Sequence, residues 1–121
     1  MINFSEDAVQ QMVQEDPASP VVMLNLLRFR PDGGQANYLA YLENNSAVWA
    51  RYGVEPLYAG AGGTPLVADS GQAWDAVAVV RYPSRQAFLD MIRDPEYLAN
   101  EHYRTDALIE SVLQPTTPVG I

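Results

Sequence analysis

The sequence predicts an α+β protein, a ferredoxin-like β-α-β-β-α-β sandwich with an extra N-terminal helix. The order of hydrophobic patterns is helix, strand, helix, two short strands, strand, two helices and strand. Strands 21–30 and 74–82 are apolar at both alternating sets of positions, as strands covered on both faces are. Because one chain has helices for only one face, we expect a second copy to cover the other in a homodimer that closes an α+β barrel.

A length of 121 residues predicts a single domain, residues 1–121, with one hydrophobic core. The first residues lack the basic and apolar pattern of a signal peptide, and no run of eighteen apolar residues occurs. We therefore expect a cytoplasmic protein that has no membrane partner.

The composition excludes several classes of site. The absence of cysteine rules out disulfides and sulfur-ligated metals, and a single histidine rules out a multi-histidine metal site within one chain. A net charge of −8 with only seven basic residues disfavours nucleic acid as a partner. The sequence predicts neither a cofactor nor a metal.

The N-terminal half begins with a helix over 5–16, because Ser5 can cap it and acidic residues fill its first turn. Strand 21–30 follows and ends at the turn 31–34. Helical spacing then predicts one helix over 35–52. The residues that share its apolar side are Tyr38, Tyr41, Leu42, Asn45, Trp49 and Tyr52.

The C-terminal half begins with extended segments at 54–59 and 64–68 and continues into strand 74–82. Ser84 is expected to cap the next helix, and Asp94 followed by Pro95 to start another that runs to about Val112. Residues 113–121 contain two prolines, which predicts a C-terminal edge strand or arm.

Several segments together resemble a family known as domain of unknown function 1330, in the dimeric α+β barrel superfamily. They are residues 20–30, 74–84, 94–97, 102–104 and 107–108. The resemblance implies a ferredoxin-like fold and a barrel built from two protomers. It implies no reaction, since the family is uncharacterised. The wider superfamily includes cofactor-free monooxygenases, lactone isomerases, polyketide cyclases and haem enzymes, but none of their catalytic residues aligns with a motif here.

His102 and Arg104 are the candidate catalytic residues. Helical spacing places His102 in an apolar stripe with Leu98 and Thr105, where a buried imidazole could transfer a proton. A core or interface histidine is the alternative. Arg104 could hold a carboxylate or enolate at a pocket mouth, or form an ion pair with a nearby acid such as Glu110.

Four further residues are candidates for shaping a ligand site: Asn25, Tyr41, Trp49 and Tyr82. Asn25 interrupts an apolar strand and requires a hydrogen bond, to a ligand or within the protein. The aromatic side chains have polar tips suited to a pocket, although such a stripe also suits a core. Ion pairing is the expected role of three charged strand residues, Arg28, Asp75 and Arg81.

Two functional hypotheses follow. The first is a cofactor-free enzyme that acts on a small organic carbonyl or carboxylate compound, with His102 as the proton-transfer group and Arg104 as the anion holder. The second is a non-catalytic module that binds a small ligand or a protein. The sequence contains no motif that decides between them.

Overall fold

The computed structural model describes residues 2–120, whose four strands form one antiparallel sheet in the order β2-β3-β1-β4. This arrangement confirms the ferredoxin-like fold that the sequence predicts. The strands are β1 (Val21–Phe29), β2 (Glu55–Ala61), β3 (Ala76–Tyr82) and β4 (Leu108–Thr116).

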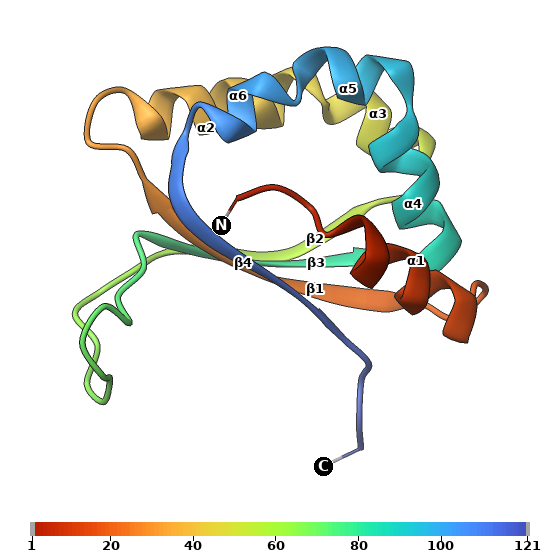
Figure 1. The fold of residues 1–121 in the computed structure, drawn as a ribbon, viewed down its shortest axis with the longest axis horizontal. Coiled ribbons are helices and arrows are strands. Elements are labelled where there is room, and N and C mark those ends of the chain that lie inside the picture. Colours follow the sequence, from red (N-terminus) through yellow and green to blue (C-terminus); the bar gives the residue numbers. More distant parts are fainter. Residues whose placement is uncertain (1, 121) are drawn as a thin grey trace.

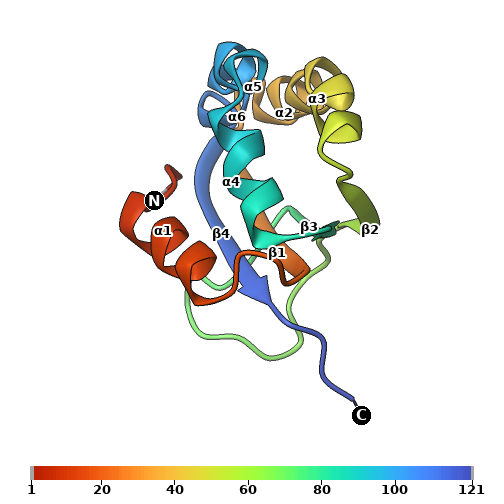
Figure 2. The ribbon, with the colours of Figure 1, turned by 90° about the vertical axis from the view of Figure 1, so that its right-hand side faces the viewer.

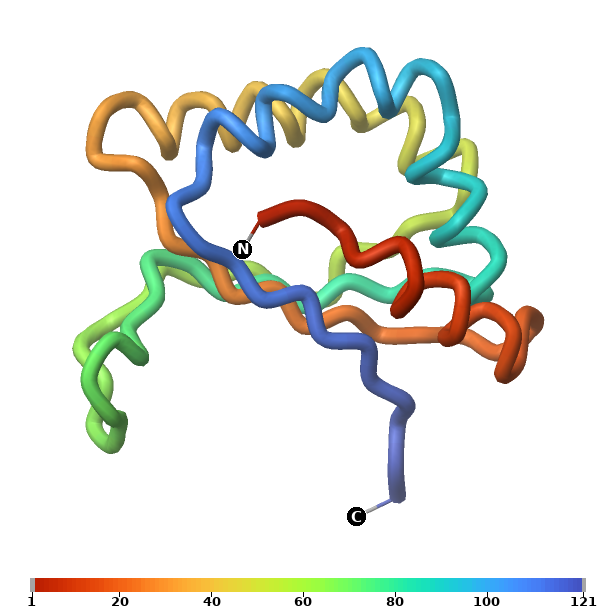
Figure 3. The backbone as a smooth tube through the Cα atoms, viewed as in Figure 1, coloured from red at the N-terminus to blue at the C-terminus, as the bar shows by residue number. Residues whose placement is uncertain are grey.

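All the helices lie on one side of the sheet, as Figures 1 and 2 show. They are α1 (Glu6–Glu15), α2 (Gly34–Asn44), α3 (Ser46–Arg51), α4 (Arg85–Arg93), α5 (Pro95–Asn100) and α6 (His102–Thr105). The loop 62–75 and the C-terminal tail project from the other side (Figure 1). The segment before α1 runs beside β4 on the helical side (Figure 3). None of the helices in residues 2–120 has the length and hydropathy that crossing a membrane requires.

The helix predicted over 35–52 is divided in two at Asn45, between α2 and α3. The Asn45 side chain is fully buried and its Nδ2 donates to the Tyr41 carbonyl oxygen at 3.0 Å. The Asn45 backbone N–H donates to the same carbonyl at 3.2 Å, and a side chain that shares a carbonyl with the backbone in this way disturbs the regular helix. Of the residues predicted to face the core, Tyr41 does so and is 6 % exposed. Leu42 does not, and 36 % of it is exposed.

The last predicted helix is too long. Helical structure ends at Thr105, and Leu108 already begins β4, so the strand covers 108–116 and not 113–121. Leu108 to Thr116 pair with β1, which satisfies backbone groups that a helix would have bonded internally. The extended segment predicted at 64–68 forms no strand in the described residues.

The predicted helix starts are confirmed by side-chain caps. Ser5 Oγ accepts from the Ala8 N–H at 3.3 Å, and Ser84 Oγ accepts from the Ala87 N–H at 2.9 Å. Asp94 accepts from the Glu96 N–H at 2.8 Å at the start of α5. Each cap satisfies an N–H that the first helical turn leaves free.

Asp94 also joins α5 to the end of α3. Its Oδ2 accepts from the Tyr52 hydroxyl at 2.7 Å and from the Arg51 guanidinium at 2.7 Å. The Tyr52 bond, followed by the Glu96 N–H and then Arg51, lowers the pKa of the Asp94 carboxyl below its ordinary value of 3.8.

We therefore expect Asp94→Ala to lower the melting temperature by about 3–6 °C at pH 7. Because the pKa is lower in the folded chain, the stabilisation is fully present at neutral pH. It begins to fall below about pH 5, as the unfolded chain starts to take up the proton, and is lost as the pH passes through the lowered value. Thermal melts from pH 7 to pH 2 should show the variant and the wild type converging. Glu43→Ala, at an exposed position of α2, is the control that should melt like the wild type.

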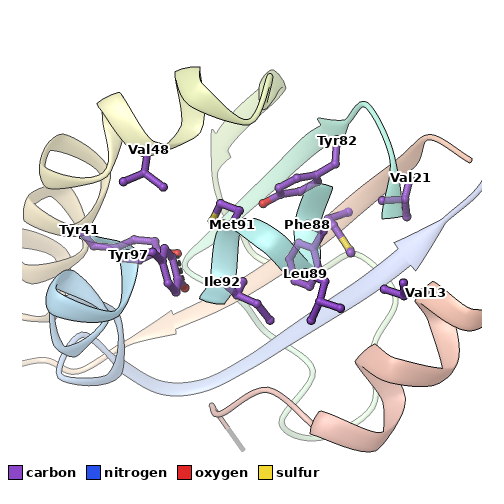
Figure 4. Packing of buried hydrophobic residues seen from close by; sticks show 11 residues of the cluster. Val13, Val21, Tyr41, Val48, Tyr82, Phe88, Leu89, Met91, Ile92 and Tyr97 are labelled. Carbon is purple, nitrogen blue, oxygen red and sulfur yellow. Dashed lines mark hydrogen bonds between the residues drawn. The ribbon is translucent and has the colours of Figure 1, made fainter. Parts of the chain in front are cut away.

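The core lies between the sheet and the helices. Figure 4 shows its buried side chains, which β1 and β3 supply from one face and the helices from the other. In β1 the core-facing residues alternate and include Val21, Met23 and Leu27, each at most 3 % exposed. Burial of this kind is the main source of folding free energy.

The other face of the sheet is also apolar, as the sequence predicts, and no helix of the described residues covers it (Figure 2). We call this surface the open face. It is formed by Val22, Leu24, Leu26, Val77, Val79 and Val112, which the strand register brings side by side. Each of these side chains is only partly buried or exposed.

Two of the three strand residues expected to form ion pairs, Arg28 and Arg81, do so within the chain. Arg28 pairs with Glu110 on β4, and Arg81 lies 4.0 Å from Glu55 on β2. Asp75 forms none among the described residues, and instead its Oδ2 accepts from the Phe29 backbone N–H at 2.8 Å.

Candidate functional site

A cavity of about 230 Å³ lies on the helical side of the sheet, where the N-terminal segment and α1 meet β1 and β4. Its walls are mainly apolar, and Arg104 is the one charged residue among them. The lining comprises Ile2, Asn3, Phe4, Ser5, Ala8, Val9, Met12, Met23, Phe88, Arg104, Ser111, Leu113 and Pro115. Concave apolar sites with a few polar groups are where proteins bind small molecules.

Arg104, on α6, is only 7 % exposed. Its Nη1 donates to the Ile2 carbonyl at 2.5 Å and its Nη2 donates to Ser111 Oγ at 3.3 Å. The guanidinium carbon lies 5.0 Å from the centre of the Phe4 ring, within the range of a cation–π contact. These contacts hold the N-terminal segment against β4.

No ion pair among residues 2–120 includes Arg104. The sequence alternative of an ion pair with a neighbouring acid is therefore wrong for the described chain, and Glu110 pairs with Arg28 instead. The guanidinium lines the cavity and is buried there. A buried charge without a counter-ion is costly and rare in proteins.

Tyrosine side chains gather near Arg104. Burial raises the pKa of Tyr38, Tyr82 and Tyr97, and the positive charge of Arg104 opposes that rise in each case. Burial outweighs this effect, raises the pKa of Tyr97 to about 12 and raises that of Tyr82 well above its usual range. The phenols are therefore neutral at pH 7 and act as hydrogen-bonding groups.

Tyr41 of α2 and Tyr97 of α5 meet through their hydroxyls at 3.0 Å, the dashed contact in Figure 4. Burial, followed by the charge of Tyr97, raises the pKa of Tyr41 as well. Trp49 packs edge-on against Tyr41, with ring centres 5.7 Å apart, and its buried Nε1 has no hydrogen-bond partner among the described residues. This aromatic group belongs to the core.

None of the four predicted ligand-binding residues lines the cavity. Tyr82 lies behind the lining: the centre of its ring is 5.1 Å from that of Phe88, which lines the cavity. Asn25 lies half-buried on the core side of β1 and donates to the Met23 carbonyl at 3.4 Å. Tyr41 and Trp49 lie in the aromatic group beyond. A ligand role for these residues stays a prediction.

His102 lies apart from the cavity. It is exposed at the start of α6, and its ring packs on Tyr103 with centres 4.1 Å apart. The expectation of a buried imidazole in an apolar stripe is wrong, because α5 ends at Asn100 and the stripe does not continue as one helix. Its catalytic role stays a prediction without support from this position.

Three lining residues that contact Arg104 carry no signal of a site in the sequence: Ile2, Phe4 and Ser111. Ile2 and Phe4 precede the first predicted element, so no periodicity marks them. Ser111 was expected inside a helix, and only the alternation of a strand brings it to the same face as Leu113.

The described residues hold no group of three or more histidine or acidic side chains arranged to bind a metal ion. The charged group available at the cavity is thus the Arg104 guanidinium. It can bind or polarise an oxygen through charge-assisted hydrogen bonds.

Comparison with solved structures agrees with this fold. A protein of unknown function from Rhodopseudomonas palustris is 31 % identical with a TM-score of 0.91, covering 99 % of this chain and 98 % of its own. A dimeric protein of unknown function with a ferredoxin-like fold from Bacteroides fragilis is 13 % identical, with a TM-score of 0.54 and coverage of 80 % and 94 %.

A putative antibiotic biosynthesis monooxygenase from Bacteroides thetaiotaomicron is 20 % identical, with a TM-score of 0.58 and coverage of 84 % and 90 %. At such identities the likeness concerns the fold alone. No curated protein is significantly similar in sequence. Residues 33–113 match the family described as Domain of unknown function (DUF1330), as the sequence motifs indicate. The chain belongs to the DUF1330 family.

Proposed function

We propose that this protein is a homodimer in which each protomer binds one small, mainly apolar compound through a carboxylate or carbonyl oxygen. The observation that carries the ligand proposal is Arg104, a buried guanidinium without an acidic partner among the described residues, at the wall of an apolar cavity.

The chemistry of the guanidinium favours an anionic oxygen. Arginine has five N–H donors, and the contacts to Ile2 and Ser111 use two of them. Both acceptors are neutral, so the positive charge is not compensated locally. A carboxylate would supply the missing charge in a site where water screens it poorly.

Volume and lining restrict the rest of the ligand. A space of about 230 Å³ equals the volume of about eight waters of the liquid, at about 30 Å³ each, and so suits a compound of about that many non-hydrogen atoms. Side chains such as Val9, Met12 and Leu113 favour a hydrocarbon or aromatic body. Hexanoate and benzoate have the required size and chemistry.

The lining favours binding over turnover. It contains no histidine, aspartate or glutamate, and the nearby tyrosines are protonated at neutral pH. Proton abstraction by a lining side chain would need a base of suitable pKa within hydrogen-bonding reach. Of the two sequence hypotheses, we therefore favour the non-catalytic ligand-binding module.

The open face supports the homodimer. Contiguous apolar surfaces of this kind are typically interaction sites. A second copy of the same sheet would meet it with a matching apolar surface, as in sheets packed face to face. The neighbour of similar fold from Bacteroides fragilis is itself described as dimeric.

Calorimetric titration tests the ligand proposal with two matched pairs, hexanoate against 1-hexanol and benzoate against benzyl alcohol. We expect each carboxylate to bind about tenfold to a hundredfold more tightly than its alcohol, because a hydrogen bond to a charged group contributes about 1.5–3 kcal/mol. Arg104→Met should remove the preference for the carboxylate. Melting curves establish that the variant is folded.

His102→Ala is the control, because His102 is exposed and does not line the cavity. We expect it to bind both carboxylates as the wild type does. Equal affinity for acid and alcohol in the wild type, or an unchanged preference in folded Arg104→Met, would show that Arg104 only anchors the N-terminal segment.

A further inference from the structure

The loop between β2 and β3, residues 62–75, projects away from the body of the protein. Figure 1 shows it leaving the sheet on the side opposite the helices, the side of the open face. Leu66 and Val67, close to the middle of this segment in the sequence, are 98 % and 96 % exposed. We call this segment the 62–75 arm. Two large apolar side chains in water on a projecting segment are an unfavourable arrangement for a protomer on its own.

The base of the arm is firmly held. Arg28, on the open face, donates to the carbonyl oxygens of Gly71 at 2.6 Å and Ala73 at 2.7 Å, and its guanidinium lies 4.9 Å from the centre of the Trp74 ring. Arg28 thereby fixes the returning limb of the arm to the sheet.

Backbone contacts close the base. The Gly62 N–H donates to the Asp75 carbonyl at 2.8 Å, and the Asp75 N–H donates to the Leu27 carbonyl at 2.8 Å. A Cβ at Gly62 would lie 1.9 Å from the Trp74 carbonyl oxygen, so the limbs approach as closely as glycine permits. Because these contacts fix the base of the arm to the sheet, they also limit the directions in which the rest of the arm can point.

The arm is long enough to pass a second sheet. Leu66 and Val67 follow the end of β2 at Ala61 by five and six residues, a length of chain that can extend over roughly 16–20 Å, whereas packed sheets lie about 10 Å apart. With a partner's sheet on the open face, Leu66 and Val67 would reach that partner beyond the plane of contact. The extended pattern at 64–68, which finds no strand in the described residues, suits a segment that is ordered by such a contact.

We propose that the 62–75 arm packs Leu66 and Val67 onto the partner protomer and so extends the dimer interface beyond the open face. The inference rests on the proposed homodimer. Because a two-fold interface repeats every contact, two arms embrace the dimer and four apolar side chains become buried.

Fluorescence reports the contact directly, since the chain has no cysteine of its own. The Leu66→Cys variant is labelled with a polarity-sensitive fluorophore, and its emission is recorded over a range of protein concentrations. Sedimentation of the same samples gives the concentrations at which the dimer forms. We expect the emission to shift to shorter wavelength as the dimer forms. Leu39→Cys, exposed on α2, is the matched label that should not shift.

Sedimentation of the double variant Leu66→Ser, Val67→Ser measures the contribution to assembly. The loss of apolar burial should weaken dimerisation at least tenfold, whereas Leu39→Ser should leave it unchanged. Water-like emission from a labelled dimer, or a double variant that dimerises as the wild type does, overturns the arm contact but leaves the open-face dimer standing. A wild-type protein that is monomeric at every concentration overturns both.

Discussion

Replacing Leu26 by glutamate is expected to convert the proposed homodimer into a folded monomer. Leu26 lies within the open face, where the register sets it directly across from Val77 on β3 and Val112 on β4. In a two-fold interface the substitution occurs twice, and each carboxylate would lose water among apolar neighbours. Arg28 on the same face already binds Glu110 and the carbonyl oxygens of Gly71 and Ala73. A buried unpaired charge costs several kcal/mol, so we expect dimerisation to weaken by at least a hundredfold.

The fold of the protomer should survive this change, because Leu26 is only partly buried in the single chain and the glutamate can remain in water. Light scattering at micromolar concentration measures the mass, and circular dichroism checks the fold. Leu39→Glu introduces the same charge at an exposed site of α2 and should leave the dimer intact. A Leu26→Glu protein that keeps the mass of two chains would place the interface elsewhere.

The architecture could be predicted because the strongest sequence signals are local. Side chains that cap helices, such as Ser84 and Asp94, act within three residues and mark α4 and α5 correctly. The sequence also shows that both faces of β1 are apolar, because apolar residues occupy both alternating sets of positions along the strand. That pattern indicates that something covers the second face, and the structure shows that no helix of the described chain does.

Residues 106–112 show where the same reasoning fails. Ile109 and Val112 follow His102 at spacings that suit a helix, yet they lie on β4. Leu108, Glu110 and Val112 also fit a strand, and short apolar segments satisfy both periods. Pairing with β1 decides the outcome. This contact joins segments about eighty residues apart, so no local pattern could reveal it.

The candidate site follows the same division. Arg104 could be selected from the sequence as a functional cation, but its burial and its contact with Ile2, 102 residues away, depend on tertiary structure. Helical spacing predicts that His102 is buried. In the structure the helix ends early, and the His102 side chain is exposed. Chemistry can be proposed from residue types, whereas the environment that gives a residue its role is set by long-range packing.

Truncation of Tyr97 should cause the largest loss of stability of any single change proposed for this chain. Tyr97 is fully buried, packs its ring on Tyr41 at 6.0 Å and bonds the Tyr41 hydroxyl at 3.0 Å. Tyr97→Ala leaves a cavity and an unpartnered hydroxyl, and we expect a loss of about 3–5 kcal/mol in the free energy of unfolding. Tyr97→Phe removes only the hydroxyl and should cost about 1 kcal/mol.

Urea unfolding of the three proteins at one fixed concentration measures both losses, since the stability of a dimer depends on concentration. The ratio of the two values separates packing from hydrogen bonding at the junction of α2 and α5. If Tyr97→Phe cost as much as Tyr97→Ala, the hydroxyl pair and not the ring would hold this junction together. In that case the hydrogen bond between these neutral phenols, whose pKa burial raises, would be the main link between α2 and α5.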